Sequence, residues 1–200
     1  MNPVETLYVL SGKEAPGRSP EFTAAHILLA LRIIGERGPG RQQLSTELRL
    51  GEGTMRNLLR RLAEERLVSS TRRGVALTGD GERLLAELRS VIRGRPVPKS
   101  RLTVGEHNYA VLVKGGASKV RLGVEQRDRA LISGALGATT LVVMEGGLKA
   151  PALADVVEDR LSDAIRELGP ADGDAVVIGT GGSPCWAELG AYSAGLEMLC

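Results

Sequence analysis

Four side chains whose polar groups suit nucleic-acid recognition lie close together in the first half of this 200-residue chain. They are Arg56, Asn57, Arg60 and Arg61. Guanidinium groups bind phosphates and guanine edges, and an asparagine amide can pair with adenine. The apolar residues among them recur at helical spacing and define a separate face: Met55, Leu58, Leu59 and Leu62. The sequence predicts a helix that begins at Thr54 and turns a basic, polar face outward.

Two further cations, Arg72 and Arg73, lie between short β-prone runs at residues 67–71 and 75–78. This pattern predicts a hairpin with a basic tip, where cations would contact phosphates or the minor groove. A closing helix is expected next, because apolar residues keep helical spacing at Leu84, Leu85, Leu88, Val91 and Ile92.

Two helices are predicted upstream of the basic helix. The first begins at Thr23 and ends at Gly38-Pro39-Gly40, and the second contains Leu44 and Leu48 and is ended by the turn at residues 50–53. Two short helices joined by a glycine-bearing turn, the second of them basic on its outer face, form a helix-turn-helix. We therefore expect a winged helix-turn-helix domain over residues 1–93.

The segments L-S-T-E-L-R-L-G-E-G-T-M-R-N-L-L-R-R-L-A-E-E-R-L-V and G-V-A-L-T-G-D-G-E-R-L-L resemble winged-helix transcriptional regulators of prokaryotes. The whole arrangement is most similar to uncharacterised archaeal proteins that pair such a domain with a small C-terminal α/β domain. The resemblance implies a partner, double-stranded DNA, and contacts from Thr54, Arg56, Asn57, Arg60, Arg61, Arg72 and Arg73. The chain departs from the family at Arg66, where glycine is usual, and a positive φ there would strain the arginine.

Simpler interpretations of these residues stand beside the DNA-binding one. The arginines could form a solvated helix face, Thr54 could serve only as a helix cap, and Asn57 could simply be exposed. The charge distribution favours DNA, because residues 1–100 hold 17 Lys and Arg against 11 Asp and Glu, whereas residues 101–200 hold 9 against 13.

Composition excludes several other classes of protein. Two cysteines, Cys185 and Cys200, are too few for a disulfide framework, and His26 and His107 are too few for a Cys/His metal site. His26 is expected to pack in or beside the core. No signal peptide and no membrane-spanning run is evident, so the sequence predicts a cytoplasmic protein with no membrane partner, no metal and no cofactor.

The second half of the chain changes its pattern after residues 94–104, which contain two prolines and are expected to form a linker. Strands and helices then alternate over residues 105–200, predicted to be a small α/β domain for regulation or dimerisation. With a hairpin near residues 148–150 the order is β-α-β-β-α-β-α, a ferredoxin-like arrangement with an added helix. Without it the domain is a small parallel βα unit. The predicted fold class is α+β, and the ferredoxin-like arrangement is preferred.

A glycine-rich segment of this domain could cradle a small anion. It consists of Gly179, Thr180, Gly181, Gly182 and Ser183 and lies between a strand and a helix, where backbone N–H groups can face a ligand. The alternative is a tight turn in which Ser183 caps the helix and Pro184 occupies its first position.

The leading hypothesis is a dimeric transcriptional regulator whose C-terminal domain senses a small anionic effector or holds two copies together. The alternative is a phosphate-binding enzyme with an appended winged helix. No set of catalytic residues supports the enzyme, so we expect no catalysis. The final helix, residues 184–200, has apolar residues on two sides, and a second subunit is expected to cover one of them. The alternative is that the sheet and the helix predicted at residues 157–168 bury both sides.

Overall fold

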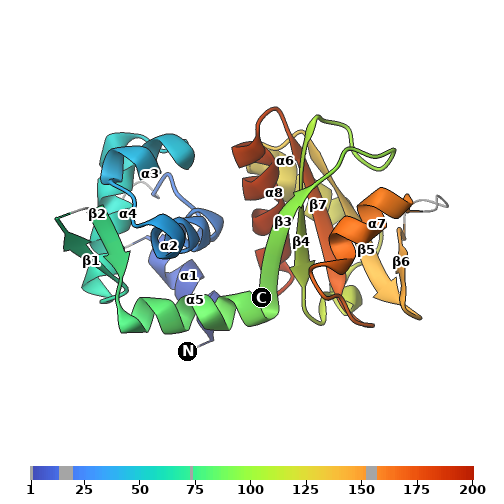
Figure 1. The fold of residues 1–200 in the computed structure, drawn as a ribbon, viewed down its shortest axis with the longest axis horizontal. Helices are drawn as coiled ribbons and strands as arrows, with labels where there is room; N and C mark the ends of the chain where they lie inside the picture. Colours follow the sequence, from blue (N-terminus) through green and yellow to red (C-terminus); the bar gives the residue numbers. More distant parts are fainter. Residues whose placement is uncertain (1, 14–19, 73, 152–156) are drawn as a thin grey trace. The chain divides into compact units, whose positions relative to one another are not determined.

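The computed structural model describes residues 2–13, 20–72, 74–151 and 157–200. The chain divides into two compact units, Met1–Arg89 and Ser90–Cys200. The predicted α+β fold class with two domains is confirmed (Figure 1).

The N-terminal unit begins with a helix that the sequence analysis did not place, α1 (Pro3–Ser11). Asn2 caps it: the Asn2 Oδ1 accepts the Val4 N–H at 3.0 Å, and the Glu5 carboxylate accepts the Asn2 N–H at 3.1 Å as part of a capping box. The predicted helices follow as α2 (Ala24–Arg37), α3 (Arg41–Glu47) and α4 (Glu52–Glu64). The hairpin, β1 (Val68–Thr71) and β2 (Gly74–Leu77), and the closing helix α5 (Gly79–Val91) come next, in the predicted order.

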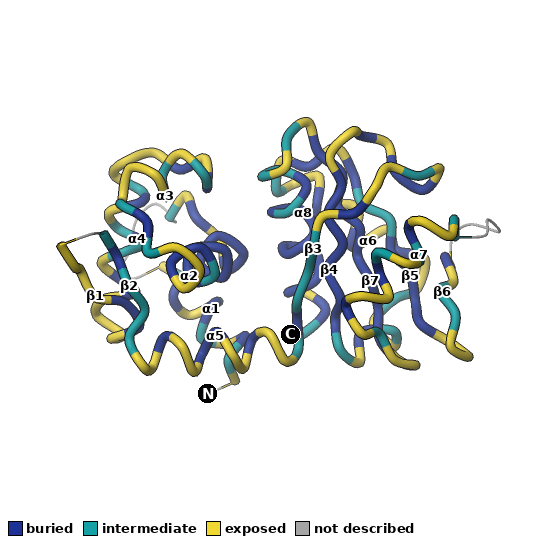
Figure 2. Tube along the Cα trace, viewed as in Figure 1, coloured by how far each residue is buried: buried dark blue, intermediate teal, exposed yellow. Residues whose placement is uncertain are grey.

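Helix α2 is the core of this unit. Its residues from Ala24 to Leu31 are all buried, and only its last turn is exposed (Figure 2). His26 is 8% exposed, and its Nδ1 accepts the backbone N–H of Thr23 at 3.1 Å. Burial lowers the pKa of His26 from 6.5 to about 4, so the ring is neutral near pH 7. The prediction of a packed histidine is confirmed.

Helices α3 and α4 are each followed, two residues after their last residue, by an arginine in the left-handed region. Arg49 has φ 55° and Arg66 has φ 57°. After α4, the Leu67 N–H bonds to the Leu62 carbonyl at 2.8 Å and the Arg66 N–H bonds to the Ala63 carbonyl at 3.0 Å, which is the Schellman pattern. The predicted strain at Arg66 is therefore present, because this motif favours glycine at that position.

The C-terminal unit contains a five-stranded sheet in the order β3-β4-β7-β5-β6. Its strands are β3 (Ile92–Val97), β4 (His107–Val113), β5 (Gly137–Met144), β6 (Gly147–Lys149) and β7 (Ala175–Gly181). The helical elements are η1 (Gly116–Lys119), α6 (Val124–Ile132), α7 (Asp159–Arg166) and α8 (Pro184–Glu197). From β4 onward the predicted succession β-α-β-β-α-β-α is confirmed. The ferredoxin-like arrangement is wrong, because β7, the fourth strand of this succession, lies between β4 and β5, where a ferredoxin-like sheet has the third strand. The parallel alternative is wrong, because all neighbouring strands are antiparallel.

The predicted linker is also wrong in part, because residues 94–97 belong to strand β3. Gly94 and Pro96 made this segment resemble a linker, but β3 lies at the edge of the sheet, where proline costs no ladder hydrogen bond. A side chain at Gly94 would come within 2.6 Å of the Ala110 carbonyl, so glycine lets the two strands approach. The boundary between the two units falls between Arg89 and Ser90, before this strand.

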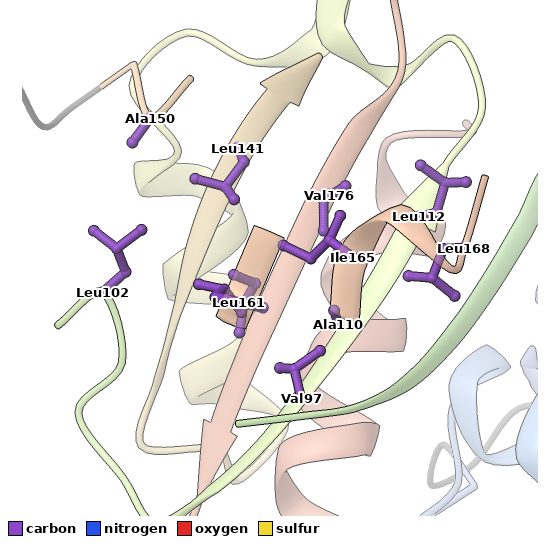
Figure 3. Packing of buried hydrophobic residues seen from close by; sticks show 11 residues of the cluster. Val97, Leu102, Ala110, Leu112, Leu141, Ala150, Leu161, Ile165, Leu168 and Val176 are labelled. Carbon is purple, nitrogen blue, oxygen red and sulfur yellow. The ribbon is translucent and has the colours of Figure 1, made fainter. Parts of the chain in front are cut away.

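The sheet is covered on both faces. Leu161 and Ile165 of α7 pack against Ala110, Leu112 and Val176 on one face (Figure 3). Helix α8 lies on the other face, against β4 and β7, with α6 packed beside it. A side chain at Gly190 of α8 would come within 2.5 Å of Ala135 Cβ, so the α6 region meets α8 at close range. Residues 189–196 of α8 are consequently all buried. The expectation that a second subunit covers one side of this helix is therefore wrong, and α6, not the helix at residues 157–168, provides that cover.

Candidate nucleic-acid interface

Helix α4 carries the residues that were predicted to contact DNA bases, and its inner face is packed in the core. Met55, Leu58 and Leu62 are 0% exposed and fix the inner face of the helix. The helix begins two residues earlier than predicted, with Gly51 at the N-cap position and Glu52 and Gly53 inside the helix. Thr54 is therefore not the cap, and its hydroxyl donates to Glu21 Oε2 at 3.2 Å.

Arg56, Asn57 and Arg60 lie on the outward part of α4. Arg56 and Arg60 are exposed and Asn57 is half-buried. Arg60 Nη1 donates to both carboxylate oxygens of Glu64 at 2.7 Å, and its Nη2 donates to Asn57 Oδ1 at 2.8 Å. Arg60 is thus held in an extended, oriented position, while Glu64 partly neutralises its charge.

Arg61 is a structural residue, which corrects its assignment as a DNA contact. It is 6% exposed, and its Nη1 donates to the carbonyls of Leu10 at 2.7 Å and Gly12 at 2.6 Å. Its guanidinium carbon lies 5.2 Å from the ring centroid of Phe22, a cation–π contact. Arg61 therefore ties α4 to the end of α1 and to the segment before α2, and it is not available to a ligand.

The hairpin presents hydroxyl groups and a cation to solvent. Ser69, Ser70, Thr71 and Arg72 are all exposed, and Arg72 occupies the turn between β1 and β2. Arg73, the other predicted wing contact, lies outside the described residues. The hairpin is fixed in place because the Val75 N–H bonds to the Pro39 carbonyl at 3.0 Å, and a side chain at Gly74 would come within 2.6 Å of the same carbonyl oxygen.

Arg49 is a candidate contact that the sequence analysis missed. It is exposed in the turn between α3 and α4, two residues before the N-cap position of α4. The signal was present in the sequence as a cation inside the predicted helix-turn-helix turn, but the glycines at residues 51 and 53 drew the predicted turn too far along the chain.

The glycine-rich segment of the C-terminal unit is not an open cradle. Gly179, Thr180 and Gly181 are buried in the central strand β7, so the predicted loop is a strand up to Gly181. A side chain at Gly179 would come within 2.3 Å of the Ala187 carbonyl, and one at Gly181 within 2.5 Å of the Ala187 N. These two glycines let α8 pack closely on the sheet. Pro184 occupies the first position of α8 and Ser183 its N-cap position, but the Ser183 side chain makes no capping hydrogen bond.

Within the described parts of the chain, no group of three or more His, Cys, Asp or Glu side chains is placed to hold a metal ion. Nor does any described helix combine the length and the apolar character needed to cross a membrane.

Comparisons with known proteins match both units. Residues 26–83 match the PH0730-like N-terminal domain, and residues 104–198 match a domain of unknown function, DUF4443. One solved structure that is similar is the hypothetical protein PH0730 from Pyrococcus horikoshii OT3, with 26% sequence identity and a TM-score of 0.73. The matched region covers 89% of this chain and 93% of the PH0730 chain. Among curated proteins, none matches. The chain is thus similar, over most of its length, to an uncharacterised archaeal protein.

Proposed function

We propose that this chain is a DNA-binding transcriptional regulator whose N-terminal unit is a winged helix-turn-helix. The observation that carries the proposal is the outward face of α4, where Arg56, Asn57 and Arg60 stand on a helix anchored by a fully buried apolar face. A helix presented in this way after a short helix and a turn is the reading element of helix-turn-helix proteins. The exposed hairpin with Arg72 supplies the second contact, to phosphates or the minor groove.

Arg56, Asn57 and Arg60 are proposed to contact base edges in the major groove. Arg49 and Arg72 are proposed to contact phosphates. Arg61 is left out of this set because it is buried. Thr54 is kept as a contact because it lies half-buried in the first turn of α4, although its hydroxyl donates to Glu21 Oε2 in this structure.

The phosphate-binding enzyme is not proposed as a second function. Its support was the glycine-rich segment, and Gly179 and Gly181 serve the packing of α8 instead. The C-terminal unit is proposed to act in assembly.

The test is selection of binding sites by the full-length chain from a pool of random duplexes. A selected sequence is expected, and Arg56→Ala and Arg60→Ala should each reduce discrimination between it and random DNA by about 1–3 kcal/mol. Arg72→Ala should weaken binding to all duplexes about equally. A pool that shows no enrichment would contradict sequence-specific regulation, and equal losses from all three variants would remove the assignment of readers.

A further inference from the structure

Helix α6 carries apolar side chains on the face that points to solvent. Its buried side consists of Gln126 and Ala130, which are 6% and 0% exposed. On the opposite side, Val124 and Leu131 are 42% and 45% exposed. They lie seven residues apart, two helical turns, and therefore on one ridge of the helix. The outward positions of a surface helix are typically polar, so two exposed apolar side chains on one ridge of α6 are suited to a partner.

The charges on the same ridge have a particular order. Arg127 and Asp128 lie between the two apolar residues; they pair with each other at 3.3 Å, and both side chains are 55% exposed and so remain open to a partner's charges. Val124, Arg127, Asp128 and Leu131, called the α6 stripe below, occupy positions i, i+3, i+4 and i+7, which form one continuous face. Read in either direction, the stripe is apolar at its ends and carries opposite charges at its two central positions.

We infer that the α6 stripe is the surface on which two copies of this chain associate, with the two α6 helices antiparallel about a two-fold axis. An axis between Arg127 and Asp128 places each Arg127 against Asp128 of the second copy and each Val124 against Leu131 of the second copy. Every contact then occurs twice, as an isologous interface requires. The order of charges selects a second copy rather than an unrelated partner, because the stripe is complementary to itself when reversed.

Neighbouring residues extend the surface. Leu122, before α6, is 60% exposed, and Ile132, its last residue, is 77% exposed. In the antiparallel pairing, Ile132 of one copy lies beside Leu122 of the other. The interface therefore has an apolar patch at each end and two ion pairs at its centre.

The inference adds to the proposed function, since two DNA-binding units related by a dyad can read a palindrome. Its test requires no DNA, so its failure and that of the proposed function are separable. The full-length chain is expected to be a dimer by sedimentation equilibrium at concentrations between about 1 and 100 µM. Leu131→Glu should weaken the dimer at least tenfold, while Met144→Glu, a control at an exposed apolar residue outside the surface, should not.

Charge reversal gives the sharper test. Arg127→Asp alone and Asp128→Arg alone each place like charges against each other twice, so each variant should be monomeric where the parent chain is dimeric. An equimolar mixture of the two variants should form a heterodimer, because each reversed residue then meets its opposite. The double variant, Arg127→Asp with Asp128→Arg, should dimerise again. A monomeric parent chain, a dimer indifferent to these changes, or a mixture that stays monomeric would each overturn the inference.

Discussion

The guanidinium of Arg61 lies over the ring of Phe22, with its Cζ 5.2 Å from the ring centroid. This contact joins the fourth helix of the chain to the segment that precedes the second. The same guanidinium donates to the Leu10 and Gly12 carbonyls, so a single side chain fixes three segments of the N-terminal unit.

Replacing Arg61 by alanine should therefore reduce stability and not DNA recognition as such. The two carbonyls would lose their donor and the ring would lose its cation, for which we expect a loss of about 2–4 kcal/mol in the free energy of unfolding. Denaturant unfolding measures the loss. The exposed Arg56→Ala is the matched control and should change stability by less than about 0.5 kcal/mol. Similar stabilities for the two variants would contradict the structural role of Arg61.

The stability of the protein should fall between pH 6.5 and about 4 because of His26. Its pKa is about 4 in the folded chain and 6.5 in the unfolded one, so the unfolded chain binds more protons in this range. The stabilising effect is complete above pH 6.5 and is lost as the pH falls toward 4, by about 3 kcal/mol in all.

Unfolding curves measured across this pH range should show the slope in the parent chain and a much smaller slope in His26→Gln. The exposed His107→Gln is the control and should keep the parent profile. Asp174 acts at lower pH: burial raises its pKa, but hydrogen bonds from Lys114 and the backbone N–H groups of Gly115 and Ala171 outweigh this and hold the pKa below 3.8. A slope unchanged by the loss of His26 would mean that other groups cause it.

Two glycines of the same segment, Gly179 and Gly182, should differ in how far substitution by alanine lowers the stability of the fold. Gly179→Ala would bring a methyl group within 2.3 Å of the Ala187 carbonyl and should cost several kcal/mol, whereas Gly182→Ala meets nothing within 4 Å and should be tolerated. Thermal unfolding of the two variants distinguishes packing from ligand binding as the reason for the glycines. Equal tolerance of both changes would contradict the close packing of α8 on β7.

Removing the charge of Glu64 should strengthen DNA binding. Glu64 holds Arg60 through two hydrogen bonds at 2.7 Å and places a negative charge beside it. Glu64→Gln would free the guanidinium and remove repulsion of the phosphates, so affinity for duplex DNA should rise a few-fold. Glu82→Gln, on α5, makes the same change of net charge away from α4 and should have a smaller effect. A decrease in affinity for Glu64→Gln would show that the oriented arginine matters more than its free charge.

In the N-terminal unit, helices α2 to α5 and the hairpin followed from the sequence because local signals and packing agree there, whereas α1 was not predicted. Helical spacing of apolar residues predicted α2 and α4, and the β-prone runs on either side of the 72–73 turn predicted the hairpin. The burial of Arg61 could not be predicted in this way. It lies one position beyond Arg60 on the helix, and what covers it comes from α1 and Phe22, some 40 to 50 residues away in sequence.

The C-terminal unit shows where sequence patterns mislead. Gly94 and Pro96 are typical of a linker, yet an edge strand accommodates both. The glycines of residues 179–182 are typical of an anion-binding loop, yet two of them lie under a helix. In both cases the glycine marks a close approach of two backbones, and only the three-dimensional neighbours identify which group makes that approach.

The affinity of the full-length chain for duplex DNA, measured as a function of salt concentration, tests the central claim most directly. Because Lys and Arg release counterions from phosphates, the logarithm of the affinity should fall linearly with the logarithm of the salt concentration, by tenfold or more between about 50 and 200 mM. The triple variant Arg49→Ala, Arg60→Ala, Arg72→Ala should bind more weakly and with a shallower slope. A folded chain that shows no affinity for duplex DNA at low salt would contradict the proposal.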